Sequence, residues 1–336
     1  MNLNKKHIIT LIFLFVIFIA QSQDIHFSQF YYSPLSLNPA NTGNFDGDWR
    51  ISNNYRRQWG SISIPYNTIS IGLDKTFYFH SKKIGGGIFF VNDKSGSAHL
   101  SVNKIFLSGA YHTQYKGHNL HAGIQIGFVL KSFGGDVTYP SQYDRGIGGF
   151  NNQLPNNETA LNDNLSYPDI NIGLMWSKQF GKIKPEAGYT IFHINNPKEN
   201  FSNKNNHLPL RHVFHIGTKI DLNQKFFVKP RMFYMNHKRA GDMIIGANFG
   251  YNLPENNYKM KSLFLGPHIR TILNKSDALI FAIGINFKNM DIGISYDINI
   301  SPLQVASNGA GAIEFSLIYR SKSSVPTKIA IPCDRF

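Results

Sequence analysis

The chain has 336 residues, a formal net charge of +14 and a single cysteine. One cysteine excludes an intramolecular disulfide and a thiolate metal cluster, and no run of basic residues is dense enough to indicate nucleic-acid binding. Only 16% of the residues are charged, while Phe, Tyr and Gly are abundant; an ordinary soluble domain carries roughly 25% charged residues. This composition favours a membrane β-barrel, whose strands are apolar on one face only.

Residues 1–22 have the features of a secretory signal peptide. Lys5 and Lys6 precede an apolar run from Ile8 to Ala20, which ends at a small-x-small cleavage site. The run is short for a membrane anchor, and no other apolar run approaches the roughly twenty residues of a transmembrane helix. We therefore expect an exported protein whose mature chain begins near Gln23.

Residues 23–48 are rich in aromatic residues and Asn and show no periodicity. Pro34, Pro39, Gly43 and Gly47 break any long element. A free tail would not carry so many aromatic residues. We therefore predict an ordered segment that packs on or inside the body of the protein.

Residues 49–320 read as a succession of strands separated by turns, and no amphipathic helix of useful length is found. Alternation of apolar and polar residues places each set on one face of a strand. The predicted strands are 49–57, 66–78, 84–92, 100–115, 118–132, 169–180, 182–194, 211–221, 224–236, 241–252, 258–272, 278–287, 289–299 and 312–320.

The last two strands alternate most strictly. Taken alone, they fit either half of a soluble sandwich or two strands of a barrel in lipid. In a barrel the charged residues Asp291, Asp297, Glu314 and Arg320 face the lumen or the rim, where water removes the cost of their charge. The lipid-facing residues are then Ile292, Ile294, Tyr296, Ile298, Ile313, Phe315, Leu317 and Tyr319.

The connections favour the barrel. If the first strand runs outward from the periplasm, the even-numbered connections should be short turns and the odd-numbered ones longer external loops. The three longest connections, 134–168, 195–210 and 301–311, are all odd-numbered. The sequence thus predicts an all-β, transmembrane antiparallel β-barrel of about 14 strands in the outer membrane, closed by pairing of the last strand with residues 50–57.

Three prolines within predicted strands count against this assignment, because each removes a ladder hydrogen bond. They are Pro185, Pro230 and Pro267. Bulges near the rim would accommodate them.

No catalytic or metal-binding pattern is found. Histidines cluster around two turns (His112, His118 and His121; His207, His212 and His215). No HExxH motif accompanies them and no carboxylate lies at chelating spacing, so we interpret them as turn and rim residues facing water. There is no GxSxG motif, and in a barrel repeated Gly relieves crowding or allows curvature. We expect no catalysis and no cofactor.

Four stretches resemble the PorP/SprF family of Bacteroidota outer-membrane proteins, which is associated with type IX secretion and gliding motility. They are FSQFYYSPLSLNPANTG at 27–43, YRRQWGSI at 55–62, SYDINISPLQVASNGAGAIEFSLIYR at 295–320 and IPCDRF at 331–336. The resemblance implies a non-enzymatic outer-membrane barrel. Its implied partners are a large secreted adhesin or other cargo and periplasmic, peptidoglycan-linked secretion components. A barrel in the outer membrane would also contact lipid and lipopolysaccharide.

The tripeptide Asn38-Pro39-Ala40 also looks like the hatch motif of the long-chain fatty-acid transporter barrels. A passive channel or hydrophobic-solute transporter is therefore the alternative function. Pro39 has a fixed φ and holds Asn38 extended, which suits a turn packed against a wall. Residues 23–48 are thus either a plug, with Gly43 near its end, or an ordinary turn ahead of the first strand.

Two further places are candidate partner-binding sites. Arg56, Arg57 and Trp59 lie beside the first external loop, where they would bind a partner or a lipopolysaccharide phosphate, or anchor the barrel at the interface. The tail 321–336 is expected in the periplasm as a docking signal or a plug. It contains Cys333, Arg335 and Phe336.

Overall fold

The computed structural model describes residues 26–62, 64–80, 82–96, 100–133, 140–151, 153–154, 164–199, 206–238, 240–254, 259–272 and 275–324. The predicted signal peptide and the tail beyond residue 324 lie outside these ranges. In the ranges that are described, no helix has both the length and the apolar character needed to cross a membrane.

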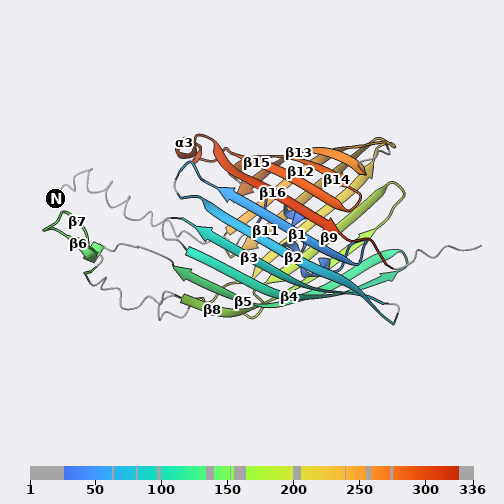
Figure 1. Cartoon of the computed structure of the whole chain (residues 1–336). Helices are drawn as coiled ribbons and strands as arrows, with labels where there is room; N and C mark the ends of the chain where they lie inside the picture. The colour runs from blue at the N-terminus through green and yellow to red at the C-terminus, as the bar shows by residue number, and fades with distance from the viewer. Residues whose placement is uncertain are drawn as a thin grey trace, which may run out of the picture.

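Within these residues, fourteen antiparallel strands close into a barrel, seen from the side in Figure 1. The count and order agree with the prediction. The strands are β1 (Trp49–Gln58), β2 (Tyr66–Phe79), β3 (Lys82–Ser95), β4 (Leu100–Tyr115), β5 (His118–Phe133), β8 (Asn164–Lys178), β9 (Ile183–Phe192), β10 (Arg211–Asp221), β11 (Phe226–His237), β12 (Ala240–Asn252), β13 (Met260–Ile272), β14 (Lys275–Phe287), β15 (Met290–Asn299) and β16 (Ala310–Arg320).

The barrel closes between its first and last strands, as predicted. Arg50 lies opposite Arg320, and the ladder continues to Gln58 opposite Ala312. Closure leaves no strand edge exposed to lipid, where an unpaired backbone group would be costly.

The main departures from the predicted elements lie in the loops. β8 begins at Asn164, five positions before the predicted start at 169. The long connection before it also contains a short hairpin, β6 (Tyr143–Asp144) paired with β7 (Gly149–Phe150), and the connection before β16 contains one helical turn, α3 (Gln304–Ser307). None of these short elements has a hydrophobic period long enough to read from sequence.

Side chains alternate between the two faces of the wall as predicted. All eight residues expected to face lipid in β15 and β16 are exposed or half-buried, whereas Asp297 and Glu314 on the opposite face are completely buried. One part of the prediction is wrong: water does not surround these two carboxylates. Other protein groups fill the lumen around them.

The prolines are accommodated without bulges. Pro230 lies where the β10–β11 ladder is interrupted between Gly217–Arg231 and Ile220–Val228, although the register is the same on both sides. Its pairing with Ala247 of β12 is intact. Pro267 shows the same arrangement, with a gap towards β12 and pairing to Phe281 of β14. The side of each proline that lacks an N–H donor thus lies at a gap in one ladder.

The two ends of the barrel differ. The connections 59–65, 134–163, 193–210 and 300–309 meet at one end, which we call the long-loop end. The connections 80–81, 116–117, 179–182, 222–225, 253–259 and 288–289 join strands at the other, the short-turn end. The predicted parity is confirmed for most of these connections. The exceptions are the connections after β3, β11 and β13, which are short although they lie at the long-loop end, and the connection 253–259, which is as long as 59–65 although it lies at the short-turn end.

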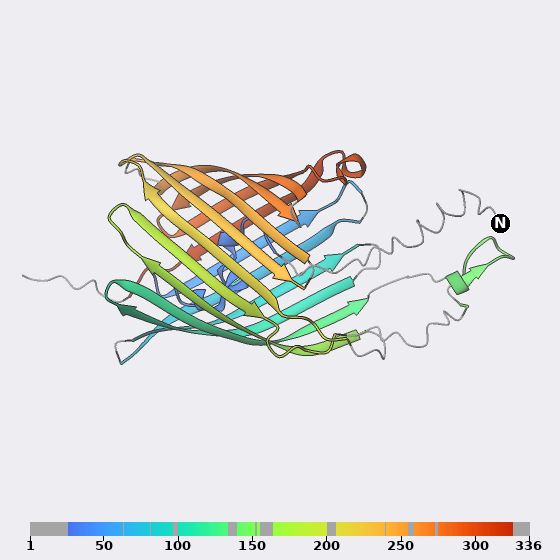
Figure 2. The ribbon, with the colours of Figure 1, turned by 180° about the vertical axis from the view of Figure 1, so that it is seen from behind.

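Residues 26–48, which we call the luminal segment, enter the barrel and turn inside it (Figure 2). The segment folds as η1 (Phe30–Tyr32), α2 (Pro34–Leu37) and η2 (Pro39–Asn41). Asn38 is extended, at φ −160°, as expected for a residue before proline. Residues 26–48 are therefore ordered, and most of their side chains are buried inside the barrel.

The luminal segment contributes apolar side chains to three separate clusters on the inner wall. Phe30 and Leu37 pack with Phe233 and its neighbours, Leu35 packs with Phe89 and its neighbours, and Tyr32 packs with Phe264, Ala282 and Ile318. Burial of each large apolar side chain contributes about 1.5–3 kcal/mol. The segment is therefore held across the width of the lumen.

Candidate functional site: the occupied lumen

The start of the luminal segment is attached to the wall by a buried cluster of charges. The Glu314 carboxylate accepts hydrogen bonds from the backbone N–H of Ser28 (2.7 Å) and of Gln29 (2.9 Å). Arg56 donates both to Glu314 and to the hydroxyl of Ser28 (2.7 Å). Arg56 of β1 and Glu314 of β16 thus form an ion pair that also holds the start of the luminal segment.

Asp297 of β15 joins this cluster. Its Oδ2 atom accepts from Ser28 Oγ (2.8 Å), from Arg56 (3.1 Å) and from Arg270 of β13 (2.9 Å). Arg270 also donates to Asp277 (2.7 Å). Each carboxylate of this cluster thus pairs with a guanidinium group, and such pairing is the condition under which ions tolerate burial.

A second anchor holds the end of the luminal segment. Asp74 of β2 forms a bidentate pair with Arg50 of β1 (3.0 and 2.8 Å) and accepts from the backbone N–H of Gly43 (2.7 Å). Arg50 also donates to the carbonyl of Asn41 (2.9 Å) and lies over the Phe45 ring. Bidentate pairs fix orientation as well as charge, so the exit of the segment from the lumen is closely defined.

Asn38 joins the middle of the segment to the far wall. Its Oδ1 atom accepts from the N–H of Ala40 (2.9 Å), which caps η2. Its Nδ2 atom donates to the carbonyl of Leu174 in β8 (3.0 Å) and lies 3.4 Å from the carbonyl of Tyr189 in β9. A short amide side chain is suited to this position, because its oxygen accepts from a backbone N–H of the turn while its nitrogen donates to a backbone carbonyl of the strand.

A row of small residues on the inner wall makes room for the segment. Gly85, Ala110, Gly123 and Gly173 lie opposite one another in β3, β4, β5 and β8. A Cβ on Gly123 would lie 2.3 Å from the carbonyl carbon of Pro39, and one on Gly173 would lie 2.0 Å from Asn38 Oδ1. The predicted use of Gly to relieve crowding is met at these positions.

Three of the histidines predicted to face water do not, and that prediction is wrong for them. His112 and His121 are buried, and so is His215. His112 Nε2 lies 2.8 Å from the Thr42 carbonyl and its Nδ1 lies 2.7 Å from Nδ1 of His121. A carbonyl only accepts, so His112 Nε2 carries a hydrogen and donates it to the luminal segment. Among the described residues no cluster of His, Cys, Asp or Glu could hold a metal ion.

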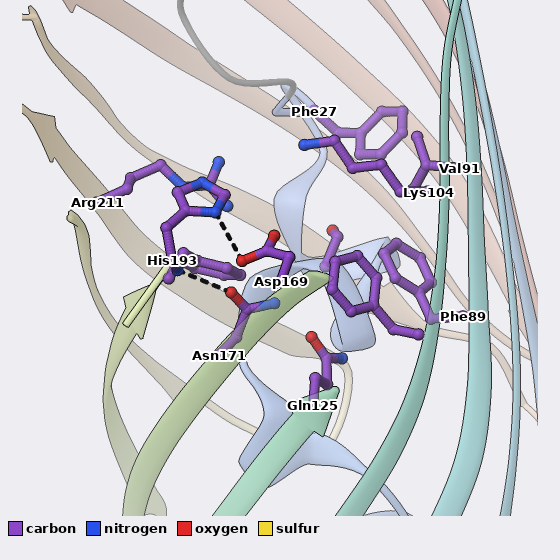
Figure 3. A pocket seen from close by; sticks show the side chains of 12 residues that line it. Phe27, Phe89, Val91, Lys104, Gln125, Asp169, Asn171, His193 and Arg211 are labelled. Atoms are coloured by element: carbon purple, nitrogen blue, oxygen red, sulfur yellow. Dashed lines mark hydrogen bonds and ion pairs between the residues drawn. The ribbon is translucent and has the colours of Figure 1, made fainter. Parts of the chain in front are cut away.

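A small cavity of about 40 Å³ lies beside the luminal segment towards the long-loop end (Figure 3). His193 points towards Asp169, with Nδ1 2.9 Å from its carboxylate, and its backbone N–H donates to Asn171 (3.0 Å). Ser36 lines the same cavity, but its hydroxyl donates to the Ser33 carbonyl (2.9 Å). The hydrogen bond of this serine is thus local to α2 and does not link it to the His193–Asp169 pair.

The residues predicted to bind partners at the first loop are divided between the two faces of the wall. Arg56 is buried in the charge cluster, so it contacts the luminal segment and is not available to lipopolysaccharide. Arg57, its neighbour, is exposed. Trp59 has φ +57° and its ring packs edge-on against Tyr66. Alternation alone explains the division, since successive residues of a strand face opposite sides.

The predicted tail residues Cys333, Arg335 and Phe336 lie outside the described residues. The first part of the tail is described and contacts the start of the barrel. Ser321 accepts from the backbone N–H of Trp49 (3.0 Å), and the N–H of Ser324 donates to Asp48 (3.0 Å). That hydrogen bond lowers the pKa of the Asp48 carboxyl below its ordinary value. The beginning of the tail thus meets the beginning of β1 at the short-turn end.

The antiparallel barrel is closed, and its own N-terminal segment is anchored in the lumen. The protein is therefore a membrane β-barrel with an occupied interior. The family model described as type IX secretion system membrane protein PorP/SprF matches residues 19–319. The chain belongs to this family, as the four sequence stretches suggested. No curated protein matches the chain.

Several solved barrels have a similar outline. The Ralstonia pickettii toluene transporter TbuX is 11% identical, with 86% of this chain and 94% of that chain covered, at a TM-score of 0.49. The monoaromatic hydrocarbon channel CymD is 11% identical, with 87% and 93% covered, at a TM-score of 0.49. The β domain of the Bordetella autotransporter BrkA is 13% identical, with 81% and 98% covered, at a TM-score of 0.38. At these TM-scores the likenesses carry no argument about function.

Proposed function

We propose that this protein is a non-enzymatic outer-membrane barrel of the type IX secretion and gliding-motility machinery. It supports secretion or surface anchoring of a partner protein, such as a large adhesin. Membership of the PorP/SprF family is the observation that carries the proposal. The signal-like residues 1–22 and the closed barrel fit a protein exported to the outer membrane.

In this proposal the short-turn end faces the periplasm and the luminal segment acts as a plug. Two buried charge clusters and three apolar clusters hold the segment in the lumen. A barrel with this interior presents surfaces to partner proteins while it limits leakage across the membrane. Periplasmic secretion components approach the short turns and the tail, and cargo or lipopolysaccharide approaches the long loops and exposed Arg57.

The lining of the lumen does not favour the alternative, a hydrophobic-solute transporter. Binding sites for small apolar molecules are lined mainly by apolar side chains. The larger cavity of the lumen is instead lined mainly by charged and polar side chains, among them Arg50, Lys229 and Asn248. We therefore place the chain's role with a polypeptide partner.

Deletion of the gene tests the proposal. We expect loss of surface display of one adhesin, or loss of gliding, with the display of unrelated surface proteins unchanged. Surface labelling of intact cells and a motility assay measure the two effects, and complementation with the intact gene is the control. Normal surface display and motility together with lost uptake of an apolar solute would contradict the proposal and support the alternative.

A further inference from the structure

A second and much larger cavity opens towards the short-turn end. Its volume is about 1000 Å³, and we call it the vestibule. Tyr31 and Tyr32 of the luminal segment form part of its lining, and strands β10 to β16 and β1 supply most of the rest. Ser321 and Asn289 lie at its mouth, since they belong to the tail and to a short turn. The vestibule is therefore closed by the luminal segment inside the barrel and accessible from one end.

The lining of the vestibule is strongly basic. Eight of its side chains are cationic and only two, Asp46 and Asp291, are carboxylates. Three of the cations form ion pairs, namely Arg50 with Asp74, Lys219 with Asp221 and Arg320 with Asp291. The cations thus still outnumber the carboxylates around one concave space, where a low-dielectric wall strengthens their field.

The deepest cations pack against aromatic rings and form no ion pair within the described part of the chain. Lys229 and Arg231 are inward-facing residues of β11, and among the described residues neither lies within the 4.0 Å of a carboxylate that defines an ion pair. Lys229 Nζ lies 5.0 Å from the Phe227 ring, and Arg231 Cζ lies 4.1 Å from the Tyr31 ring. Nη1 of Arg231 is buried without a hydrogen-bond partner. A buried charged donor left unsatisfied is costly, so the site lacks an acceptor.

Resting on the proposed function, and naming a partner chemistry for it, we propose that the vestibule binds an acidic, extended polypeptide segment entering from the short-turn end. Carboxylates of that segment complement Lys229 and Arg231. The amide side chains of Asn248, Asn252 and Asn286, which also line the vestibule, serve its backbone groups.

The shape of the site favours a peptide over a lipid. The lining residues face the lumen, so a lipid headgroup would reach them only if its acyl chains left the membrane. A small inorganic anion would occupy only a fraction of the volume and would engage few of the cations. An extended chain enters along the barrel axis and meets cations, amides and aromatic rings in turn.

The test uses the purified, folded full-length barrel and a short fluorescent peptide of alternating Glu and Ser. Binding is measured by fluorescence anisotropy, with a Gln–Ser peptide as the neutral control. We expect the Glu–Ser peptide to bind, the Gln–Ser peptide not to bind, and the affinity to fall as salt is added. Lys229→Gln/Arg231→Gln should weaken binding about tenfold or more.

The matched control is Lys116→Gln/Lys182→Gln, which removes the same charge from short turns at the same end but outside the vestibule. This variant should bind as the parent does. Arg231 also packs on Tyr31, so the double variant could fail to fold. In that case Lys229→Gln alone is used to test the loss of binding. Equal weakening in the control variant, or no binding by the parent, would overturn the proposal.

Competition separates the possible sources of negative charge. Inorganic phosphate and phosphatidylglycerol vesicles should compete poorly with the peptide, and effective competition by either would overturn the assignment to a polypeptide. Binding is measured without cells, so it can fail while the gene deletion still abolishes adhesin display. In that case the vestibule proposal is wrong and the proposed function stands. If the peptide binds but the gene deletion leaves adhesin display and gliding normal, the proposed function is wrong and the vestibule remains an acidic-peptide site.

Discussion

Replacement of Glu314 by Gln is expected to release the start of the luminal segment and to raise the ion conductance of the purified barrel in a planar lipid bilayer. The neutral amide would no longer balance the charge of Arg56, and it would offer one acceptor where the carboxylate offers two to the Ser28 and Gln29 amides. Removing one partner of a buried ion pair costs about 3–5 kcal/mol. The β-ladder between β1 and β16 does not depend on this side chain, so we expect the loss to fall on the luminal segment.

Asp221→Asn is the matched control, because Asp221 pairs with Lys219 at 2.7 Å but both side chains are more than 40% exposed. Exposed pairs contribute about 0–1 kcal/mol, so conductance and thermal stability should stay near those of the parent. An unchanged conductance in Glu314→Gln, with the barrel still folded, would show that the charge cluster does not hold the segment.

The second large effect is expected from added methyl groups in the row of small residues. In Gly123→Ala/Gly173→Ala, each new Cβ would overlap Pro39 or Asn38, at 2.3 and 2.0 Å. Overpacking costs about 1–3 kcal/mol at each site. Because the wall is fixed by ladders on both sides, the luminal segment is the part that moves. We expect a lower thermal midpoint and higher conductance.

Gly109→Ala tests whether any added methyl group has this effect. Gly109 lies in β4 beside the same row, but on the opposite face, and a Cβ there would meet only one atom, at 3.9 Å. This variant should match the parent in both measurements. If Gly109→Ala and the double variant behaved alike, steric contact with the luminal segment would not be the cause.

The strands could be predicted from sequence because their signal is local. Alternation within β15 and β16 is enough to assign Ile294 and Phe315 outward and Glu314 inward, and closure of the barrel then follows from the even strand number. The start of β8 was predicted five positions too late, with Pro168 placed at the end of the preceding loop. In the structure Pro168 lies opposite Phe128 of β5, outside the β8–β9 ladder, so its missing N–H costs no hydrogen bond.

The contacts of the lumen could not be predicted in the same way, because they join residues far apart in the chain. Ser28 and Glu314 are 286 positions apart. In the sequence Arg56 looks like a loop residue beside Arg57. Its role in holding the luminal segment follows only from its inward-facing position in β1 and from the presence of that segment in the lumen. His112 and His121 read as turn histidines for the same reason. The alternation of side chains along β4 and β5 would have found them, because it places both histidines on the inward face of their strands.

The most direct test of the central claim is a disulfide between the luminal segment and the wall. Thr42 Oγ1 lies 2.5 Å from Ser108 Oγ of β4, so cysteines at these two positions should be within bonding reach. In a Cys333→Ser background, we expect Thr42→Cys/Ser108→Cys to form an intramolecular disulfide in native membranes, seen as a mobility shift that a reducing agent reverses. Absence of the cross-link under oxidising conditions, with both thiols still free in a folded barrel, would contradict an N-terminal segment held inside the lumen.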